Sequence, residues 1–439
     1  MLMQAMTVTD SPDLSAVDAP APGARTPAPA FPPGSAALSP VLGRYFERTW
    51  VTGEGHRLTD VAGNTYLDFA CGIAVTGLGH GHPRVNAAIH QQVDRLVHVS
   101  NGLGYLEPVS ALAEALAATL PDPLDTVFFG NSGAEAVEAA LKLARRVTGR
   151  SGYVAFRGGF HGRTYGAASV TSSNENYRAG YEPLLPGVVL APFPDVHVEP
   201  EAANAAALGA LDRLLAGDAS PGDVAAVIVE PIQGEGGVNP APAAFLRGLR
   251  ERCDAMGALL IVDEVQTGLA RTGSMWAFEA AGIVPDVVCI GKALANGLPL
   301  AAIVSARELQ ARWGLGAHGS TFGGNPVACA AGLAVLATIA DEGLVANAAA
   351  RGAELAAGLQ ALATADPRLS QVRGRGLMIG VETAPELAPE LIARCADLGL
   401  LLLTAGADHE VVRWLPPLDV SSAEIGEALD VFEGALAGA

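Results

Sequence analysis

Between residues 127 and 304 the sequence alternates short apolar runs, rich in β-branched residues, with segments in which apolar residues recur at helical spacing. This alternation is typical of βα units and predicts a largely parallel sheet that is buried on both faces. Helices between the strands are expected at 134–146, 203–215 and 243–256. The expected strands are 127–129, 153–156, 188–191, 224–229, 258–262, 287–290 and 300–304.

The segments on either side of this block have a different pattern. Residues 51–67 predict a small strand hairpin, and residues 326–362 predict long Ala-rich helices. Strands at 377–382 and 411–415 and a last helix at 422–436 are expected nearer the C-terminus. We therefore expect an α/β fold in which a large, mainly parallel-sheet domain is joined by a smaller α+β domain built from both chain ends. The predicted layout is 1–35 as a disordered Pro/Ala-rich tail, 36–84 as the N-terminal segment of the small domain, 85–325 as the large domain and 326–439 as the C-terminal small domain.

The charge balance argues against a polyanionic partner. Lys and Arg total 27 against 46 Asp and Glu, which gives a formal net charge of −19, and the sequence contains no basic stripe. Such a surface does not attract nucleic acid or an anionic membrane, so neither is expected as a partner. Five scattered cysteines without a CxxC pair predict neither a disulfide framework nor a metal site, and they fit a cytoplasmic location.

Polar residues follow the predicted strands at the points where the strands end. Residues 130–135 follow the first strand, and Glu230, Asp263 and Lys292 lie at or just beyond the ends of three others. In open parallel sheets, ligands bind beyond the carboxyl ends of the strands. This edge of the sheet is therefore the predicted site.

Ser132 and Glu135 have the spacing of a capping box at the start of the first predicted helix, whose apolar face is Val137, Leu141 and Ala144. The same turn and helix N-terminus also form an anion site, because free backbone N–H groups point outward at the positive end of the helix dipole. A purely structural cap and a phosphate site are both compatible with these residues. The GxxxxGK[ST] pattern of nucleotide triphosphatases is absent here.

Only two of the cationic residues are lysines, Lys142 and Lys292. Lys142 follows Glu138 by four residues within a predicted helix, so we expect a solvated ion pair between them. Lys292 instead ends a buried strand, with no carboxylate at helical spacing. A buried lysine that titrates low is the usual amine for trapping a carbonyl, and arginine cannot form a Schiff base.

Asp263 ends an apolar strand, where an unpaired carboxylate would be costly, so it must meet a cation or strong donors. That cation is either a structural arginine or the protonated ring nitrogen of a bound cofactor. A phosphate site, an acid at a strand end and a carbonyl-trapping lysine together match three demands of pyridoxal phosphate. These are to hold the phosphate, to keep the ring protonated and to tether the aldehyde.

Seven motifs occur along the chain in a specific order and spacing. They are 131–135 (NSGAE), 160–164 (FHGRT), 230–237 (EPIQGEGG), 260–273 (LIVDEVQTGLARTG), 285–286 (PD), 291–294 (GKAL) and 320–326 (STFGGNP). By these highly specific motifs the sequence, from about Gly43 to the C-terminus, resembles the class III (omega-amino-acid) aminotransferases, which implies pyridoxal-phosphate fold type I and a transaminase activity.

The resemblance implies that pyridoxal 5'-phosphate is the cofactor, and that Lys292 forms the Schiff base with it and then moves the substrate proton. Asp263 would pair with the pyridine nitrogen, and Gln266 would hydrogen-bond the ring hydroxyl. Thr321 would reach the phosphate from the partner subunit, so we expect a homodimer with shared active sites. The other implied contacts are Ser132, Gly133 and Ala134 at the phosphate, Phe160 and Val265 on the two ring faces, and His161 in a positional part.

The same resemblance assigns three residues to the substrates. Arg163 would take the distal carboxylate of the amino donor, and Arg413 would bind the alpha-carboxylate of 2-oxoglutarate. Bidentate pairing with a carboxylate is what arginine geometry does well. Glu235 would pair with Arg413 while an omega-amine substrate is bound. One site would thus serve two half reactions.

The identity of the amino donor is the open question at this stage. Residues 99–101 and 320–326 favour acetylornithine enzymes, whereas residues 135–138 and 181–187 favour 4-aminobutyrate enzymes. We expect a 4-aminobutyrate-like donor, with acetylornithine or ornithine as the alternative. An amino-acid racemase on the same fold remains a further alternative.

Overall fold

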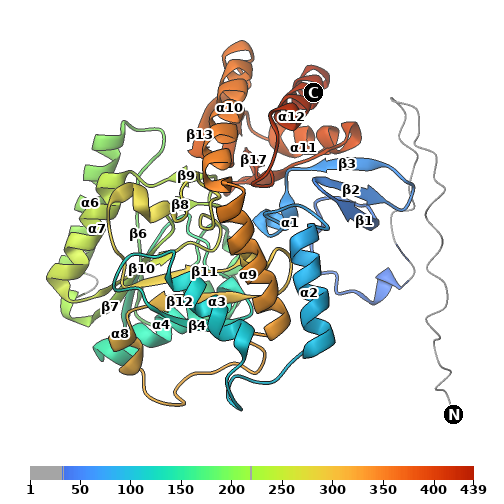
Figure 1. Cartoon of the computed structure of the whole chain (residues 1–439). Coiled ribbons are helices and arrows are strands. Elements are labelled where there is room, and N and C mark those ends of the chain that lie inside the picture. Colours follow the sequence, from blue (N-terminus) through green and yellow to red (C-terminus); the bar gives the residue numbers. More distant parts are fainter. Residues whose placement is uncertain (1–31, 33, 218–219) are drawn as a thin grey trace.

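The computed structural model describes residues 32, 34–217 and 220–439 (Figure 1). Apart from residues 32, 34 and 35, the predicted disordered tail therefore lies outside the described residues. The predicted domain boundaries at residues 84 and 325 stay predictions.

A seven-stranded sheet forms the centre of the larger part of the molecule, in the order β4-β12-β11-β10-β7-β5-β6 (Figure 1). All seven strands were predicted. β12 runs antiparallel to both of its neighbours, whereas the other pairs are parallel, so the sheet is mixed but largely parallel. The strands are β4 (Thr126–Gly130), β5 (Gly152–Phe156), β6 (Val188–Ala191), β7 (Val224–Val229), β10 (Leu259–Asp263), β11 (Val287–Ile290) and β12 (Ala301–Ser305).

The continuous apolar runs of these strands are explained by burial on both faces. In β11, Val287 and Cys289 pack into one hydrophobic cluster, and Val288 and Ile290 pack into a second cluster on the other face. Successive side chains of a strand point to opposite faces, so a strand covered on both sides cannot alternate apolar and polar residues. The first cluster includes the apolar face of α4 (Gly133–Thr148), and the second includes α7 (Ala243–Met256).

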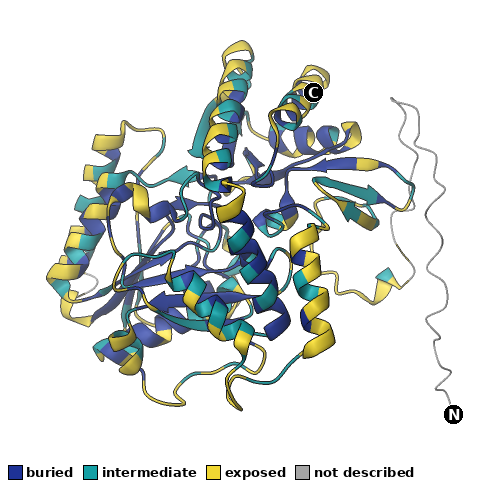
Figure 2. Cartoon of the chain, viewed as in Figure 1, coloured by how far each residue is buried: buried dark blue, intermediate teal, exposed yellow. Residues whose placement is uncertain are grey.

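Helix α9 (Pro326–Asp341) is buried along most of its length, whereas the outer helices are exposed on one side (Figure 2). In the described part of the chain no single helix is long and apolar enough to cross a membrane. The remaining helices are α1 (Cys71–Ala74), α2 (Pro83–Arg95), α3 (Glu107–Ala117), α5 (Tyr165–Val170), α6 (Pro200–Gly217), α8 (Arg307–Ala311), α10 (Leu344–Ala365), α11 (Leu387–Leu398) and α12 (Ser422–Gly438), with short 3-10 turns at η1 (Ser35–Ala37), η2 (Glu175–Tyr177), η3 (Pro221–Asp223), η4 (Ala277–Ala281) and η5 (Lys292–Ala295).

Two smaller four-stranded sheets lie outside the large one, in the orders β1-β2-β3-β15 and β13-β14-β17-β16. The first joins the two chain ends, because Leu400 and Leu401 of β15 pair in parallel with Leu67 and Asp68 of β3. The predicted hairpin at 51–67 has three strands instead of two. The strands are β1 (Trp50–Glu54), β2 (Arg57–Asp60), β3 (Thr65–Asp68), β13 (Leu369–Arg375), β14 (Met378–Thr383), β15 (Leu400–Leu401), β16 (Leu403–Ala405) and β17 (Val411–Trp414), and β8 (Ile232–Gln233) pairs with β9 (Asn239–Pro240).

Candidate active site

A cavity of about 400 Å³ opens beyond the carboxyl ends of β4, β5, β7, β10 and β11. It lies where the sequence predicted the site, because the polar residues after these strands converge on it. Most of the predicted site residues line it. Those residues are Gly133, Ala134, Phe160, His161, Arg163, Glu235, Asp263, Val265, Gln266 and Lys292, joined by Gly162 and Glu230.

Asp263, the last residue of β10, is buried and makes two hydrogen bonds. Its Oδ2 lies 2.8 Å from Nδ1 of the buried His161, and its Oδ1 accepts from the backbone N–H of Val265 at 3.0 Å. Among the described residues no arginine pairs with Asp263, so the structural arginine that the sequence allowed is not found. Burial lowers the pKa of His161, but the hydrogen bond and charge of Asp263 outweigh it and raise the pKa overall. This buried acid is thus held by two partners, His161 and the Val265 N–H, and still faces the cavity.

Lys292 follows β11 after one residue, Gly291, and lines the cavity. Its φ of 44° is unusual for a residue with a Cβ and marks a constrained turn. Burial lowers its pKa, and the nearby Arg413 acts in the same direction, while the Glu235 carboxylate opposes them. A lowered pKa increases the fraction of neutral amine, which is the form that attacks a carbonyl.

The N-terminus of α4 presents free backbone donors beside the cavity. Gly133 and Ala134 are the first two residues of the helix, so their N–H groups have no acceptor within it. A Cβ on Gly133 would lie 2.7 Å from Cγ1 of Val265, so only glycine allows this turn to pack against Val265. The turn at Gly133 and the side chain of Val265 are therefore adjacent.

The predicted capping box at this helix is only half formed. Ser132 Oγ accepts from the backbone N–H of Glu135 at 3.3 Å. The Glu135 carboxylate, however, accepts from the backbone and side chain of Asn131 at 2.9 and 2.8 Å rather than from the backbone of Ser132. Ser132 is exposed and does not line the cavity, so its predicted phosphate contact stays a prediction.

Arg413 of β17 is fully buried and lies behind the cavity wall. Its Nη1 donates to Glu235 Oε1 at 2.6 Å and to Gln266 Oε1 at 3.4 Å. Its Nε and Nη2 have no hydrogen-bond partner in the described structure. Leaving buried guanidinium nitrogens without acceptors costs free energy. A carboxylate that paired with these two nitrogens would remove that cost, so Arg413 can still bind one. Burial tends to raise the pKa of Glu235, but Arg413 and Lys292 outweigh it and lower the pKa overall.

Arg163 is exposed at the mouth of the cavity. Its guanidinium carbon lies 4.4 Å from the ring centroid of Tyr177 and 5.9 Å from that of Phe160. The two rings meet edge to face at 5.4 Å. This cation–π stacking orients Arg163 without using its N–H donors, so they stay available for an anion. Tyr177 was not among the residues predicted from the sequence.

Glu230 also lines the cavity, and no role for it was predicted from the sequence. Its two carboxylate oxygens accept from the backbone N–H groups of Phe160 at 2.8 Å and Gly234 at 3.0 Å. Burial raises its pKa to about 7, with the His161 charge acting in the opposite direction. The position of Glu230 after a buried strand could have marked it as a site residue. Its backbone partners, however, lie on two separate loops.

One sequence prediction differs from the structure, and one predicted site residue lies outside the cavity. The Glu138–Lys142 ion pair is wrong: Lys142 Nζ lies 2.9 Å from Nδ1 of His318, and Glu138 accepts from Thr164 Oγ1 at 2.6 Å. Thr321 is exposed and lines a different cavity, together with residues of 100–106. A single chain therefore does not bring Thr321 to the site, and its contact across a dimer stays a prediction.

The residues that surround the cavity fit pyridoxal phosphate. Unpaired N–H groups at a helix start suit a phosphate, the buried carboxylate of Asp263 suits a protonated ring nitrogen, and Lys292 offers a primary amine. Val265 and Phe160 supply apolar surface on the cavity wall. In the described part of the chain no cluster of His, Cys, Asp or Glu could hold a metal ion.

Comparison with known proteins gives the same assignment. Residues 43–436 match the family model described as aminotransferase class III. An acetylornithine aminotransferase from Methanopyrus kandleri is 45% identical over 391 residues, which cover 89% of this chain and 95% of the relative. The 4-aminobutyrate aminotransferase GabT from Escherichia coli is 39% identical over 392 residues, covering 86% and 91%. An amine transaminase from an uncultivated Pseudomonas species, solved with pyridoxal phosphate bound, superposes with a TM-score of 0.84 at 31% identity and covers 94% of this chain and 99% of its own.

Proposed function

Because the chain belongs to the class III aminotransferases and is a pyridoxal-phosphate-dependent enzyme, we propose that it moves the terminal amine of N-acetylornithine to 2-oxoglutarate. The sequence alone favoured a 4-aminobutyrate-like donor. The acetylornithine alternative is better supported, because the relative from Methanopyrus kandleri shares more residues than GabT over a similar length. The products are glutamate and the semialdehyde of the donor.

Two arginines, Arg163 and Arg413, carry the proposal. Arg163 at the mouth binds the carboxylate of the donor, which lies at the end of the molecule away from the reacting amine. Meanwhile Glu235 neutralises Arg413, which has no substrate carboxylate to bind. When 2-oxoglutarate enters, Glu235 leaves and Arg413 takes the carboxylate next to the oxo group, using its unpaired Nε and Nη2.

Bound pyridoxal phosphate supplies an electron sink for the negative charge that develops when the substrate loses a proton. Lys292 Nζ takes that proton and returns it, which its lowered pKa favours. Asp263, whose orientation is fixed by His161, would keep the ring nitrogen protonated. Gln266, beside Arg413, would donate to the ring hydroxyl oxygen, and Gly133 and Ala134 would hold the phosphate by their N–H groups.

A panel of amino donors tests the proposed substrate. With 2-oxoglutarate as acceptor, kcat/KM for N-acetylornithine should exceed that for 4-aminobutyrate by at least ~10-fold, because a site that hydrogen-bonds the acetamido group would reject a donor that lacks it. Glutamate formation measures the rate, with ornithine as a third donor. A panel in which 4-aminobutyrate is the best substrate contradicts the proposal. Interconversion of amino-acid enantiomers without any oxo acid would favour the racemase instead.

The surface around Thr321 supports the proposal of a homodimer. Tyr105 is exposed and lines the same cavity as Thr321, and Leu103, Leu315 and Phe322, which are close to these cavity residues in the sequence, are exposed too. Large exposed apolar side chains mark protein interfaces. A second copy that covers this surface would bring its Thr321 to the phosphate of the first. Light scattering on the holoenzyme should give twice the chain mass, and a fully active monomer would contradict the shared site.

A further inference from the structure

The segment that carries Glu235 has little stiffness of its own. Three of its five residues, 234–238, are glycines, and Gly237 has a φ of 117° that residues with a Cβ rarely adopt. Glycine loses more conformational freedom on ordering than any other residue. Within the segment, the N–H groups of Gly237 and Val238 donate to the Gly234 carbonyl only at 3.4 and 3.3 Å, so the position of Glu235 against Arg413 also depends on neighbouring groups.

Backbone atoms of this segment are tied down from both sides. From the large-sheet side, Glu230 accepts from the N–H of Gly234 at 3.0 Å. From the other side, the N–H of Gly406 donates to the carbonyl of Glu235 at 3.0 Å. Arg373 Nε donates to the carbonyl of Gly237, also at 3.0 Å. Only the last of these bonds comes from a charged side chain outside the site.

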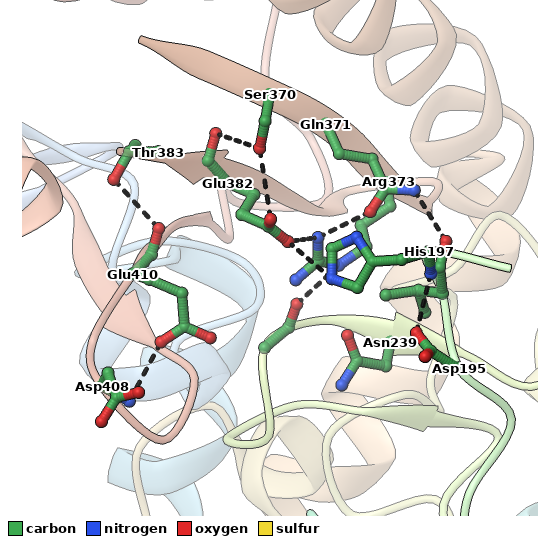
Figure 3. Close-up of polar contacts among 12 residues, drawn as sticks. Asp195, His197, Asn239, Ser370, Gln371, Arg373, Glu382, Thr383, Asp408 and Glu410 are labelled. Atoms are coloured by element: carbon green, nitrogen blue, oxygen red, sulfur yellow. Dashed lines mark hydrogen bonds and ion pairs between the residues drawn. The ribbon is translucent and has the colours of Figure 1, made fainter. Parts of the chain in front are cut away.

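Arg373 lies on β13 and is itself held by a polar cluster (Figure 3). Its Nη1 donates to Glu382 Oε2 on β14 and to Gln371 Oε1 at 2.9 Å. The Glu382 carboxylate also accepts from Ser370 Oγ at 3.2 Å. His197 contributes a further nitrogen 3.5 Å from Glu382 Oε2. The guanidinium is thereby fixed in direction, as a group that positions another must be.

The glycine at position 237 favours this contact. A Cβ there would lie 3.2 Å from Nη2 of Arg373, which is tighter than ordinary packing. A side chain there would require the guanidinium to shift by a few tenths of an ångström, and the φ of 117° at Gly237 itself favours glycine. Charge-assisted hydrogen bonds of this kind are roughly twice as strong as neutral ones.

We propose that Arg373, aligned by Glu382, is a positioning residue that holds Glu235 on Arg413 and so sets the balance between the amino-donor and oxo-acid half reactions. The inference rests on the proposed function, in which Glu235 pairs with Arg413 for one substrate and leaves it for the other. Releasing Gly237 frees the glycine-rich segment. Glu235 then neutralises Arg413 less well for the donor, and it is displaced more readily by the oxo acid.

Single-turnover half reactions on the Arg373→Gln holoenzyme test the proposal. The donor half reaction with N-acetylornithine should lose about tenfold in kcat/KM, since small displacements of a positioning group cost rates of this order or more. The half reaction of the aminated enzyme with 2-oxoglutarate should keep its rate or show a lower KM. Arg375→Gln is the matched control, because Arg375 lies on the same strand and donates instead to the carbonyl of Ala277 at 2.9 Å.

Two further variants separate this inference from the proposed function. Glu235→Gln should shift the ratio of the half reactions by itself, and adding Arg373→Gln to it should then change the ratio no further. An unshifted ratio in Glu235→Gln refutes the proposed exchange at Arg413. A shift in Glu235→Gln with equal losses in both half reactions of Arg373→Gln refutes only the part given to Arg373. Arg373→Lys, which lacks the Nε donor, should shift the ratio in the same direction if the glutamine variant does not fold.

Discussion

Replacing Lys292 by arginine should abolish transamination, with a loss of at least ~10⁴-fold in kcat, the scale seen when a catalytic nucleophile is removed. Arginine keeps the positive charge but has no primary amine, and it stays protonated at any workable pH. The lowered pKa of Lys292 reflects a site that disfavours the charged form, so a permanent cation there is doubly unsuitable. Steady-state glutamate formation measures the loss.

Lys142→Arg is the matched control, since Lys142 is the other lysine of the chain. It is exposed, contacts His318 and does not line the cavity, so the same substitution should change kcat less than about twofold, as surface substitutions usually do. After borohydride reduction, the cofactor should stay attached to the denatured wild type and to Lys142→Arg, but not to Lys292→Arg. Comparable losses of activity in both variants would contradict the assignment of Lys292.

Asp263→Asn should lower kcat on the order of a thousandfold, which is at the upper end for removing one preorganised electrostatic group. Asparagine can accept from the Val265 N–H, but it carries no charge to keep a ring nitrogen protonated. The phosphate donors at α4 are untouched, so the variant should still bind the cofactor. Glutamate formation and cofactor content are the two measurements.

The control for this variant is Asp212→Asn. Asp212 forms an ion pair with Arg252 at 2.7 Å on the outer surface, and exposed pairs contribute little. Its removal should leave kcat unchanged within error. If Asp263→Asn keeps more than about a tenth of the wild-type kcat, the ring nitrogen does not depend on this carboxylate.

The large sheet and most of the site could be predicted because both follow from local signals. β7 is buried at every position, and a run of six apolar residues bounded by polar ones has few other solutions. Asp263 and Lys292 stand out because charged residues at the ends of such strands need a reason. Here the pattern along the chain and the chemistry at its ends agree.

Side-chain partners could not be predicted in the same way, because they depend on contacts between distant parts of the chain. Glu138 has a favourable neighbour at helical spacing, but an i,i+4 pair contributes only about 0.2–0.5 kcal/mol, so tertiary contacts easily outcompete it. The helix instead presents Glu138 to Thr164 and Lys142 to His318. Strand β13 was missed because its positions are mostly only partly buried, and polar residues such as Arg373 break the apolar alternation.

Transfer of a labelled nitrogen tests the central claim most directly. The holoenzyme is incubated with N-acetylornithine that carries ¹⁵N only at its terminal amine, together with unlabelled 2-oxoglutarate. We predict that glutamate acquires ¹⁵N in step with the loss of the donor, and that Lys292→Arg forms no labelled glutamate. Unlabelled glutamate, or donor that remains unchanged in the presence of the oxo acid, would contradict the account.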